Sequence, residues 1–545
     1  MGARVLVTEP ISIEGLRTLG SSLDVVESFD IEREELLEVI GGFDALVIRS
    51  LTLVDRELLE RAERLRVVGR AGVGVDNIDI AFATSRGVMV VNAPESNVIS
   101  AAEHTMAFML ALTRNLPAAD RDLKHGVWPE AKSHGVELLG KTLGIVGLGR
   151  VGSAVAVRAA SFGMRVIAYD PYISDERFRN FGVERVPGLE ALMAASDYVS
   201  VHTPKTEETC DMIGERELSL APDGVRIINC ARGGIVNESA LVGALTAGKV
   251  AAAGIDVFEG EPVTDHPLFS FEQVLVTPHL GGSTEEAQSR VGQTVAAQVV
   301  ESLAGLLPRY ALNMPVADAE TLASVAPFMP LAEVLGSAYT QLFGVPTAGV
   351  EIRCSGEVTR YRTELLTLAF LKGLLGSVEG DGVTVVNGRH LARKRGIEVI
   401  ESRSTDADNF TSLITVRGSN GSQGSLSATL MAPHGVRITE IGGFEVDLMP
   451  TGSALVCWFD GEAVDRPGIV GGVGTMLGEA GVNINRMEVG REVIDGRAIM
   501  LISPSGDVSQ SAVELLERHT GVLEVRLLTG DRDRASERDA TNEPE

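Results

Sequence analysis

The stretch from Leu143 to Asp170 reads LGIVGLGRVGSAVAVRAASFGMRVIAYD, and it decides the fold of the region around it. Gly147, Gly149 and Gly152 form the pattern G-x-G-x-x-G between a short apolar segment and a helical run. The first glycine permits a tight turn, the second lets the backbone approach a pyrophosphate, and the third allows close packing of helix on strand. Asp170 ends the next apolar segment, where its carboxylate can accept hydrogen bonds from an adenosine ribose. Because no arginine directly follows it, the pattern predicts NAD rather than NADP.

Composition sets the broad class of the protein. At 545 residues, the chain is expected to hold three or four domains of about 150 residues each. Hydrophobic residues make up 44% of the sequence, which is typical of a globular protein with sizeable cores. The formal net charge of −27 argues against nucleic acid or an anionic membrane as a general partner. An anionic substrate would therefore need a local cluster of arginines.

Cysteine and histidine usage gives no sign of a disulfide framework or a metal site. The four cysteines include no C-x-x-C pair, and the nine histidines include no H-E-x-x-H motif. We therefore expect no metal. The N-terminus enters a strand-like segment without a signal peptide, and the sequence is expected to contain no apolar run of about 20 residues. These features predict a cytoplasmic protein.

Residues 1–96 alternate strand-like and helix-like segments, which predicts a doubly wound parallel sheet with helices on both faces. Ligands of such sheets lie beyond the carboxyl ends of the strands, and Arg49 and Arg70 fall at such ends. Asn97 precedes a long apolar helix that is expected to cross into a second domain. His104 on that helix is predicted to be a packed, hydrogen-bonded core residue rather than a catalyst.

Residues 97–283 are predicted to form a second doubly wound domain, of the Rossmann type. Arg232, Glu261 and His279 each follow a predicted strand of this domain. Because the carboxyl ends of parallel strands meet at one edge of a sheet, these three side chains are expected to converge. A helix that begins at Thr284 is expected to return the chain to the first domain, which residues 284–315 would complete.

Beyond Pro315 the pattern changes. Residues 316–452 mix helices and strands and predict an α+β intervening domain. Residues 453–529 follow the order βαββαβ, which is the ferredoxin-like plan. Residues 530–545 are charged and polar, which is typical of a disordered tail. The predicted fold class is therefore α/β, with two doubly wound parallel-sheet domains followed by an α+β domain and a ferredoxin-like domain.

Several motifs in one order resemble the D-2-hydroxyacid dehydrogenase family. Besides the glycine turn, they are RAGVGVDN (70–77), VNAPESN (91–97), NCARGG (229–234), DVFEGEP (256–262) and TPHLGGST (277–284). The similarity covers nearly the whole chain and points to the long branch of the family that oxidises 3-phospho-D-glycerate. The last domain, with DRPG (465–468) and GVNI (481–484), resembles an ACT regulatory domain. The resemblance implies a first domain that binds substrate, a second that binds NAD, and an intervening domain of allosteric or substrate-binding type.

The resemblance also implies roles for single residues. His279, held by Glu261, would exchange the proton of the substrate hydroxyl, and Arg232 would orient the substrate through its planar donors. The reaction implied is oxidation of 3-phospho-D-glycerate to 3-phosphohydroxypyruvate, the entry to L-serine synthesis. Cofactor contacts are implied for Gly147, Gly149, Arg150, Val151, Gly152, Asp170, Thr203, Pro204, Cys230, Ala231, Arg232, Asp256, His279 and Gly282.

Two further sets of contacts are expected. Arg49, Arg70 and Asn97 are the candidates for contacts with the anionic substrate. Asp465 and Asn483 are the candidates for binding a small amino acid, L-serine, at a subunit interface. An ACT domain whose edge strand pairs with a partner would make the protein a homo-oligomer, either a dimer or a tetramer.

Two other functions stay open. A glyoxylate or hydroxypyruvate reductase of the same family is one, and reduction of 2-oxoglutarate would be a side activity. Arg49, Arg70 and the two C-terminal domains count against this reading. An NAD-sensing binding protein is the other, because fold alone does not establish catalysis. The intact set of Arg232, Glu261 and His279 argues for turnover.

Overall fold

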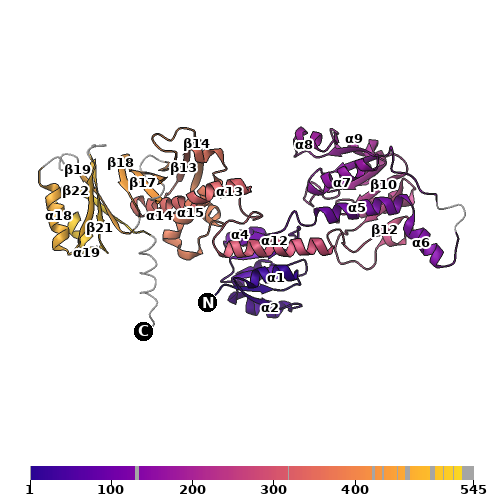
Figure 1. The fold of residues 1–545 in the computed structure, drawn as a ribbon, viewed down its shortest axis with the longest axis horizontal. Helices are drawn as coiled ribbons and strands as arrows, with labels where there is room; N and C mark the ends of the chain where they lie inside the picture. Colours follow the sequence, from indigo (N-terminus) through magenta and orange to yellow (C-terminus); the bar gives the residue numbers. More distant parts are fainter. Residues whose placement is uncertain are drawn as a thin grey trace.

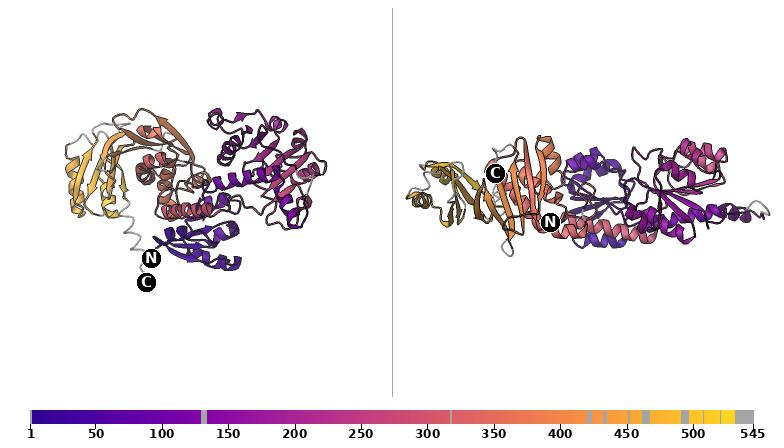
Figure 2. Two further views of the ribbon diagram at one scale, coloured as in Figure 1. Left: turned by 45° about the vertical axis from the view of Figure 1, so that its right-hand side comes forward. Right: turned by 90° about the horizontal axis from the view of Figure 1, so that it is seen from above.

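The computed structural model describes residues 2–128, 134–316, 318–419, 424–431, 435–450, 452–460, 467–490, 497–506, 508–519 and 521–530. Within these residues the strands form four sheets (Figure 1). The seven-stranded sheet lies at one end of the elongated molecule and the four-stranded sheet at the other, and both views of Figure 2 keep this order. Asp465 and residues 531–545 of the expected tail 530–545 lie outside the described residues.

The first sheet has the order β2-β1-β3-β4-β5, and all neighbouring strands in it are parallel. Buried apolar side chains fill its central strands β1, β3 and β4, which is why they pair in the middle of the sheet. Its strands are β1 (Arg4–Val7), β2 (Asp24–Glu27), β3 (Ala45–Ile48), β4 (Val67–Arg70) and β5 (Met89–Val91). Its helices are α1 (Ile13–Gly20), α2 (Arg33–Val39), α3 (Arg56–Arg61) and α4 (Ile80–Ser85).

The long helix α12 (Glu285–Leu303) returns from the second sheet and packs on the first. Thr284 caps it by accepting a hydrogen bond from the N–H of Ala287. A Cβ at Gly69 in β4 would lie 2.7 Å from the Val295 side chain and 2.8 Å from that of Val299. The helix therefore reaches the sheet only because β4 carries a glycine at this point.

The second sheet has the order β12-β11-β10-β9-β6-β7-β8 and is also parallel throughout. The chain order reverses around β6, with β7 on one side and β9 on the other, and ligands bind at such a switch point. Its strands are β6 (Thr142–Val146), β7 (Arg165–Tyr169), β8 (Glu184–Arg185), β9 (Tyr198–Val201), β10 (Val225–Asn229), β11 (Val250–Ile255) and β12 (Val274–Val276). Its helices are α5 (Val98–Thr113), α6 (Leu116–Lys124), α7 (Arg150–Ser161), α8 (Asp175–Asn180), α9 (Leu189–Ala195), α10 (Glu215–Leu220) and α11 (Glu238–Thr246).

The third sheet is mixed: β13 and β14 are parallel, and its other neighbours are antiparallel. Helices α14 and α15 pack so closely at Gly373 that a Cβ there would lie 1.9 Å from the carbonyl oxygen of Glu333. The strands are β13 (Gly349–Gly356), β14 (Glu398–Ser404), β15 (Ser412–Gly418), β16 (Ser425–Met431), β17 (Gly435–Ile441) and β18 (Phe444–Leu448). The helices are α13 (Ala319–Val325), α14 (Met329–Phe343), α15 (Glu364–Glu379) and α16 (Gly388–Lys394).

The fourth sheet has the antiparallel order β20-β21-β19-β22 of a ferredoxin-like unit, as predicted. Its elements are β19 (Ala454–Asp460), α18 (Ile469–Glu479), β20 (Ile484–Val489), β21 (Arg497–Pro504), α19 (Gln510–Glu517) and β22 (Val522–Leu528). Helix α14 packs against this unit through Phe343, whose ring centroid lies 6.4 Å from that of Trp458. Gln341 accepts a hydrogen bond from the N–H of Thr529 at 2.8 Å. The intervening domain thus contacts the ACT-like domain within one chain.

One helical run departs from the expectation that no long apolar stretch exists. Residues from Ala319 to Phe343, which comprise α13, a 3-10 turn and α14, are apolar enough by length and composition to cross a membrane. Leu331, Leu335 and Tyr339 in this run are fully buried and belong to the same core as α15. The run is therefore the core helix of a folded domain.

Candidate active site

The glycine turn lies between β6 and α7, at the switch point of the second sheet. Gly147 has a φ of 91°, in the region that favours glycine. A Cβ at Gly152 would lie 2.1 Å from the Gly147 carbonyl oxygen, whereas nothing lies within 4 Å of one at Gly149. The backbone at Gly149, the N-cap of α7, is therefore open to a ligand.

Two polar side chains flank this turn. Asp170 accepts hydrogen bonds from the N–H groups of Leu148 and Tyr172, each at 3.0 Å, and so ties the end of β7 to the turn. Thr203 follows β9, and its buried hydroxyl has no partner among the described residues. An unpartnered hydroxyl beside an open helix N-terminus fits a dinucleotide, which supplies both phosphate and amide groups.

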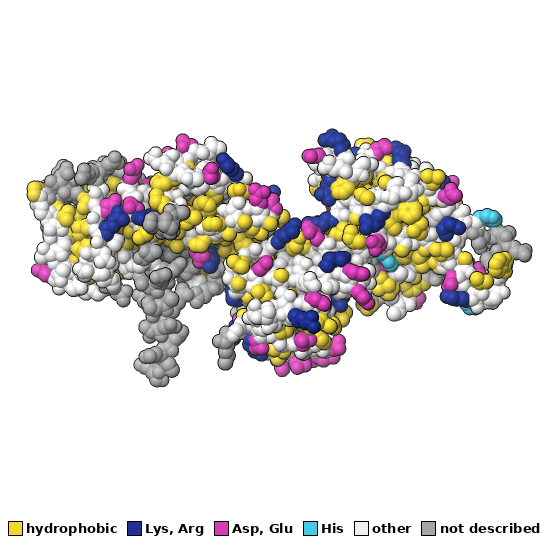
Figure 3. Space-filling model, in the orientation of Figure 1, with side chains coloured by type: hydrophobic (Ala, Val, Ile, Leu, Met, Phe, Trp, Pro, Cys, Tyr) yellow, Lys and Arg dark blue, Asp and Glu magenta, His cyan; other side chains and the backbone are white. Residues whose placement is uncertain are grey.

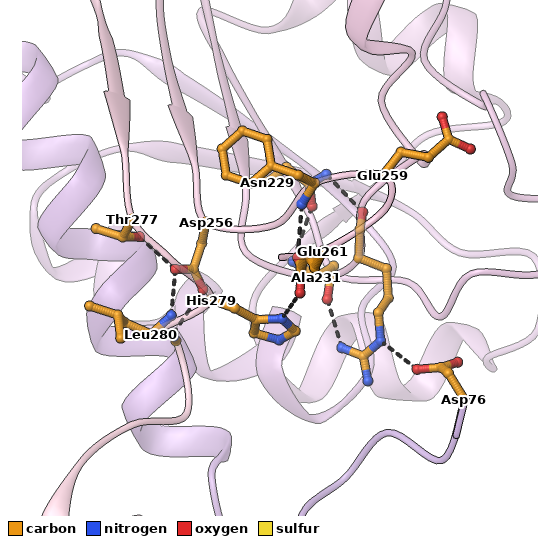
Figure 4. Close-up of polar contacts among 12 residues, drawn as sticks. Asp76, Asn229, Ala231, Asp256, Glu259, Glu261, Thr277, His279 and Leu280 are labelled. Atoms are coloured by element: carbon orange, nitrogen blue, oxygen red, sulfur yellow. Dashed lines mark hydrogen bonds and ion pairs between the residues drawn. The ribbon is translucent and has the colours of Figure 1, made fainter. Parts of the chain in front are cut away.

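His279 and Glu261 face one another at the same edge of the sheet (Figure 4). The Nδ1 atom of His279 lies 2.6 Å from Glu261 Oε2, and Glu261 Oε1 accepts the N–H of Phe258 at 2.8 Å. Burial alone would raise the pKa of Glu261, but the hydrogen bonds from His279 and Phe258 hold it below its usual value. The carboxylate therefore stays ionised at neutral pH and fixes the ring orientation of His279.

A buried carboxylate shapes the turn that carries His279. Asp256 is fully buried and accepts hydrogen bonds from the Thr277 hydroxyl at 2.5 Å and from the N–H groups of Leu280 and Gly281 at 2.7 and 2.8 Å. These bonds hold His279 in a left-handed conformation, with a φ of 54°. Asp256 thus organises the turn; its contact with cofactor stays a prediction.

His104 lies behind this turn. Its Nε2 atom is 3.0 Å from the Thr277 hydroxyl, and its ring packs at 4.7 Å between centroids against Phe108. The prediction of a packed, hydrogen-bonded residue is confirmed. Its neighbour Thr277 also bonds Asp256, so His104 belongs to the support of the His279 turn.

Two arginines, Arg70 of the first domain and Arg232 of the second, approach one another beside this edge of the sheet. Arg232 Nε lies 3.4 Å from Asp76 of the first domain, and Arg232 Nη1 donates to the Ala231 carbonyl at 2.7 Å (Figure 4). Arg70 is largely buried, and its Nε atom has no hydrogen-bond partner among the described residues. Burial and the nearby charge of Arg232 lower the pKa of Arg70 to about 10, so it stays protonated at neutral pH. The cluster therefore concentrates positive charge where the two domains meet.

Arg49 lies at the end of β3 on a loop held by another carboxylate. Glu9 accepts hydrogen bonds from successive backbone N–H groups of residues 49–52, at 2.9–3.2 Å. Burial would raise the pKa of Glu9, but the N–H donors of Thr52, Arg49 and Leu51 lower it. In the space-filling view, Lys and Arg side chains lie near the base of the notch between the dinucleotide domain and the rest of the chain (Figure 3).

The remaining predicted contacts differ in their surroundings. Asn97, the N-cap of α5, lies next to Gly282, where a Cβ would be 2.7 Å from the amide nitrogen. Arg150 lies 3.6 Å from Glu95. Burial raises the pKa of the Cys230 thiol to about 12, so this thiol is not a nucleophile at neutral pH. Asn483 lies in the fourth sheet region, where it is exposed and donates to the Ser505 hydroxyl at 2.7 Å.

Sequence reasoning missed several residues that shape the site: Glu9, Asp76, Glu238 and His266. Glu9 follows the end of β1, and such a position is a usable signal, whereas Asp76 lies on the loop after β4. Glu238 and His266 gave no sequence signal, because their contact joins a helix start to a distant loop.

Comparison with known proteins agrees with this geometry. Residues 106–281 match the family model described as D-isomer specific 2-hydroxyacid dehydrogenase, NAD binding domain. Residues 324–442 match the D-3-phosphoglycerate dehydrogenase intervening domain, and residues 462–520 match the ACT domain. Fold and site together therefore define an NAD-dependent dehydrogenase.

Full-length relatives narrow the family. The D-3-phosphoglycerate dehydrogenase of Methanocaldococcus jannaschii is 40% identical over 525 residues, which cover 96% of this chain and 99% of the relative. That of Mycobacterium tuberculosis is 42% identical over 507 residues, or 92% of this chain and 95% of the relative. The D-lactate dehydrogenase of Aquifex aeolicus, solved with NAD and lactic acid, matches with a TM-score of 0.51 and 26% identity, over 57% of this chain and 99% of that one. The chain belongs to the D-3-phosphoglycerate dehydrogenase family of D-isomer specific 2-hydroxyacid dehydrogenases.

Proposed function

We propose that this protein oxidises 3-phospho-D-glycerate to 3-phosphohydroxypyruvate with NAD, in the first step of L-serine biosynthesis. The His279–Glu261 pair, at the sheet edge that also carries Arg232 with Arg70 of the first domain beside it, is the observation that carries the proposal. The names of the full-length relatives support the substrate. Arg49 and Asn97 complete the proposed substrate contacts.

The proposed chemistry follows from the orientation of the groups. Because Glu261 holds Nδ1 of His279, the Nε2 atom is left to accept the proton of the substrate hydroxyl. Arg232 presents planar donors suited to a carboxylate, and Arg70 offers a buried positive charge for the remaining anionic groups. NAD supplies the hydride acceptor, and the glycine turn and Asp170 are proposed to hold it.

Turnover on three alcohols tests the substrate assignment. We expect kcat/KM for 3-phosphoglycerate to exceed that for glycerate and 2-hydroxyglutarate by at least tenfold, because each charged hydrogen bond is worth about 1.5–3 kcal/mol. Equal values for glycerate would favour the hydroxypyruvate reductase alternative. NAD binding without turnover of any of the three would favour a sensing role.

We further propose that L-serine binds the ACT-like domain near Asn483 and inhibits the enzyme in a homo-oligomer. The match to an ACT domain and the free edge of β20 in the fourth sheet support this proposal. Truncation is a poor test, because Val325 and Leu331 share one core with the first sheet. Asn483→Ala is expected to weaken inhibition by serine without changing basal kcat, and Asn180→Ala, at the exposed end of α8 in the second domain, serves as its control. Unchanged inhibition in Asn483→Ala would remove this residue from the effector site.

The remaining assignments complete the proposal. We propose a cytoplasmic enzyme without nucleic acid or membrane partners, which the net charge of −27 supports. A dimer or a tetramer is the proposed assembly, and sedimentation with and without serine measures it.

A further inference from the structure

A second histidine–carboxylate pair lies behind the loop that carries Glu261. Glu238 is the first residue of α11, and His266 precedes the short turn that leads to β12. Their side chains are 17% and 15% exposed, and His266 Nε2 lies 2.8 Å from Glu238 Oε2. The rings of Phe258 and Phe269 pack around His266, with centroids 5.4 and 5.7 Å away.

The hydrogen bonds fix which nitrogen of His266 carries the proton. Its Nδ1 atom accepts the N–H of Leu268 at 3.2 Å. Since Nδ1 is an acceptor, Nε2 carries the hydrogen and donates to Glu238. The pair therefore has one defined arrangement, in which His266 Nε2–H donates to the Glu238 carboxylate.

The other oxygen of Glu238 reaches the loop itself. Oε1 accepts the N–H of Glu259 at 2.7 Å. Gly233 lies close to the same peptide: a Cβ there would lie 2.0 Å from the Phe258 carbonyl carbon and 2.5 Å from the Glu259 nitrogen. The preceding N–H, that of Phe258, donates to Glu261. The peptide between Phe258 and Glu259 is thus held by a hydrogen bond to Glu238 and by close contact with Gly233, the residue after Arg232.

We propose that Glu238 and His266 are positioning residues, which hold the loop 258–261 so that Glu261 is aimed at Nδ1 of His279. The inference deepens the proposed function and rests on it. Neither residue touches the reacting atoms. Each acts through Glu261, whose own orientation depends on the Phe258 N–H next to the clamped peptide.

Glutamine cannot replace Glu238 in this arrangement. Both partners of the side chain, His266 Nε2–H and Glu259 N–H, are donors, whereas a glutamine has a single acceptor oxygen. Its NH₂ group would face one donor, and the loop would lose one of its two bonds. A buried donor without a partner is costly, so the loop is expected to shift.

A double-mutant cycle tests the inference on the full-length enzyme. We expect Glu238→Gln to lower kcat roughly tenfold with less than a twofold change in KM for NAD, since coupled residues show effects of this size. In a Glu261→Gln background the same change is expected to lower kcat less than twofold, because the group through which it acts is gone. A merely structural role would lower activity equally in both backgrounds, and that result would overturn the inference.

Matched variants keep the outcomes distinct. Glu217→Gln changes a carboxylate in the first turn of α10 that caps only its own helix, and it is expected to leave kcat unchanged. If Glu238→Gln does not fold, His266→Gln, which retains a donor toward Glu238, is expected to keep more activity than His266→Ala. Equal loss in these two, or no loss in either, contradicts the inference. An undiminished kcat in Glu261→Gln alone overturns the proposed catalytic pair, and the inference with it.

Discussion

The two walls of the cleft differ in how completely their polar groups are satisfied. On the wall formed by the second sheet, Glu261 and Asp256 accept hydrogen bonds from within the chain on both of their oxygens. On the wall formed by the first sheet, Arg70 keeps a buried Nε without a partner among the described residues, and Asp76, a 79% exposed side chain, meets Arg232 of the second sheet at 3.4 Å. The pair proposed to move the proton is thus held by the fold, while the groups proposed to bind the anion keep hydrogen-bonding capacity for a ligand.

Replacing His279, the proposed base on the wall formed by the second sheet, is expected to have the largest effect on turnover. His279→Ala is expected to lower kcat about 10²- to 10⁴-fold, because general acid–base groups contribute that much. NAD affinity, measured by fluorescence titration, is expected to change little, since the ring handles the proton. His125→Ala, which changes the exposed histidine at the C-cap of α6, is the control. Near-full activity in His279→Ala would exclude the residue from the mechanism.

Removing the positive charge of Arg70, on the wall formed by the first sheet, is expected to weaken substrate binding instead. Arg70→Ala is expected to raise KM for 3-phosphoglycerate roughly 10- to 100-fold, the worth of one or two charge-assisted hydrogen bonds. Arg61→Ala, an exposed arginine paired with Glu57 in α3, is expected to change nothing. If KM is unchanged and kcat falls, Arg70 supports the fold and does not meet the anion.

Asp170, on the second domain, is expected to set the preference for NAD over NADP. Its two oxygens each accept a backbone N–H. Asp170→Ala is expected to weaken NAD binding roughly tenfold and to reduce discrimination against NADP, whose 2′-phosphate the carboxylate repels. Paired titrations with both cofactors measure this, with Asp175→Ala on α8 as control. A wild-type enzyme that prefers NADP would show that Asp170 has been misassigned.

The smallest effect is expected for Glu9, whose carboxylate is fully hydrogen-bonded and holds the loop that carries Arg49. Glu9→Gln is expected to destabilise the fold by about 1–3 kcal/mol at neutral pH and to raise KM a few-fold, because the Arg49 loop loses an acceptor. Since the folded-state pKa of Glu9 is lowered, its stabilisation is present above pH 4.5 and is lost as pH falls through the lowered value. Thermal melts of wild type and variant should therefore converge in acid. Glu14→Gln, exposed on α1, is the control, and a constant difference at all pH values would contradict this account.

The sequence predicted those parts of the fold that depend on residues close together in the chain. The spacing of Gly147, Gly149 and Gly152 fixes a turn that the backbone adopts regardless of distant residues. Buried strands such as β3 read as apolar runs. Strands β2 and β8 gave no such signal, because both lie at sheet edges and carry exposed charged residues. Edge pairing depends on a neighbouring strand rather than on the residues themselves.

The sequence by itself determined the fold class, the NAD-type turn and the convergence of Arg232, Glu261 and His279, because parallel strands bring their carboxyl ends to one edge. Only the tertiary structure decided which of the site's polar groups find hydrogen-bond or ion-pair partners within the chain. Asp256 holds the His279 turn, Glu238 and His266 hold the Glu261 loop, and Asp76 meets Arg232 across two domains. These contacts join residues far apart in the chain, and no local spacing encodes them. The contact of α14 with the ACT-like domain arises in the same way, from the packing of two domains whose faces are each apolar.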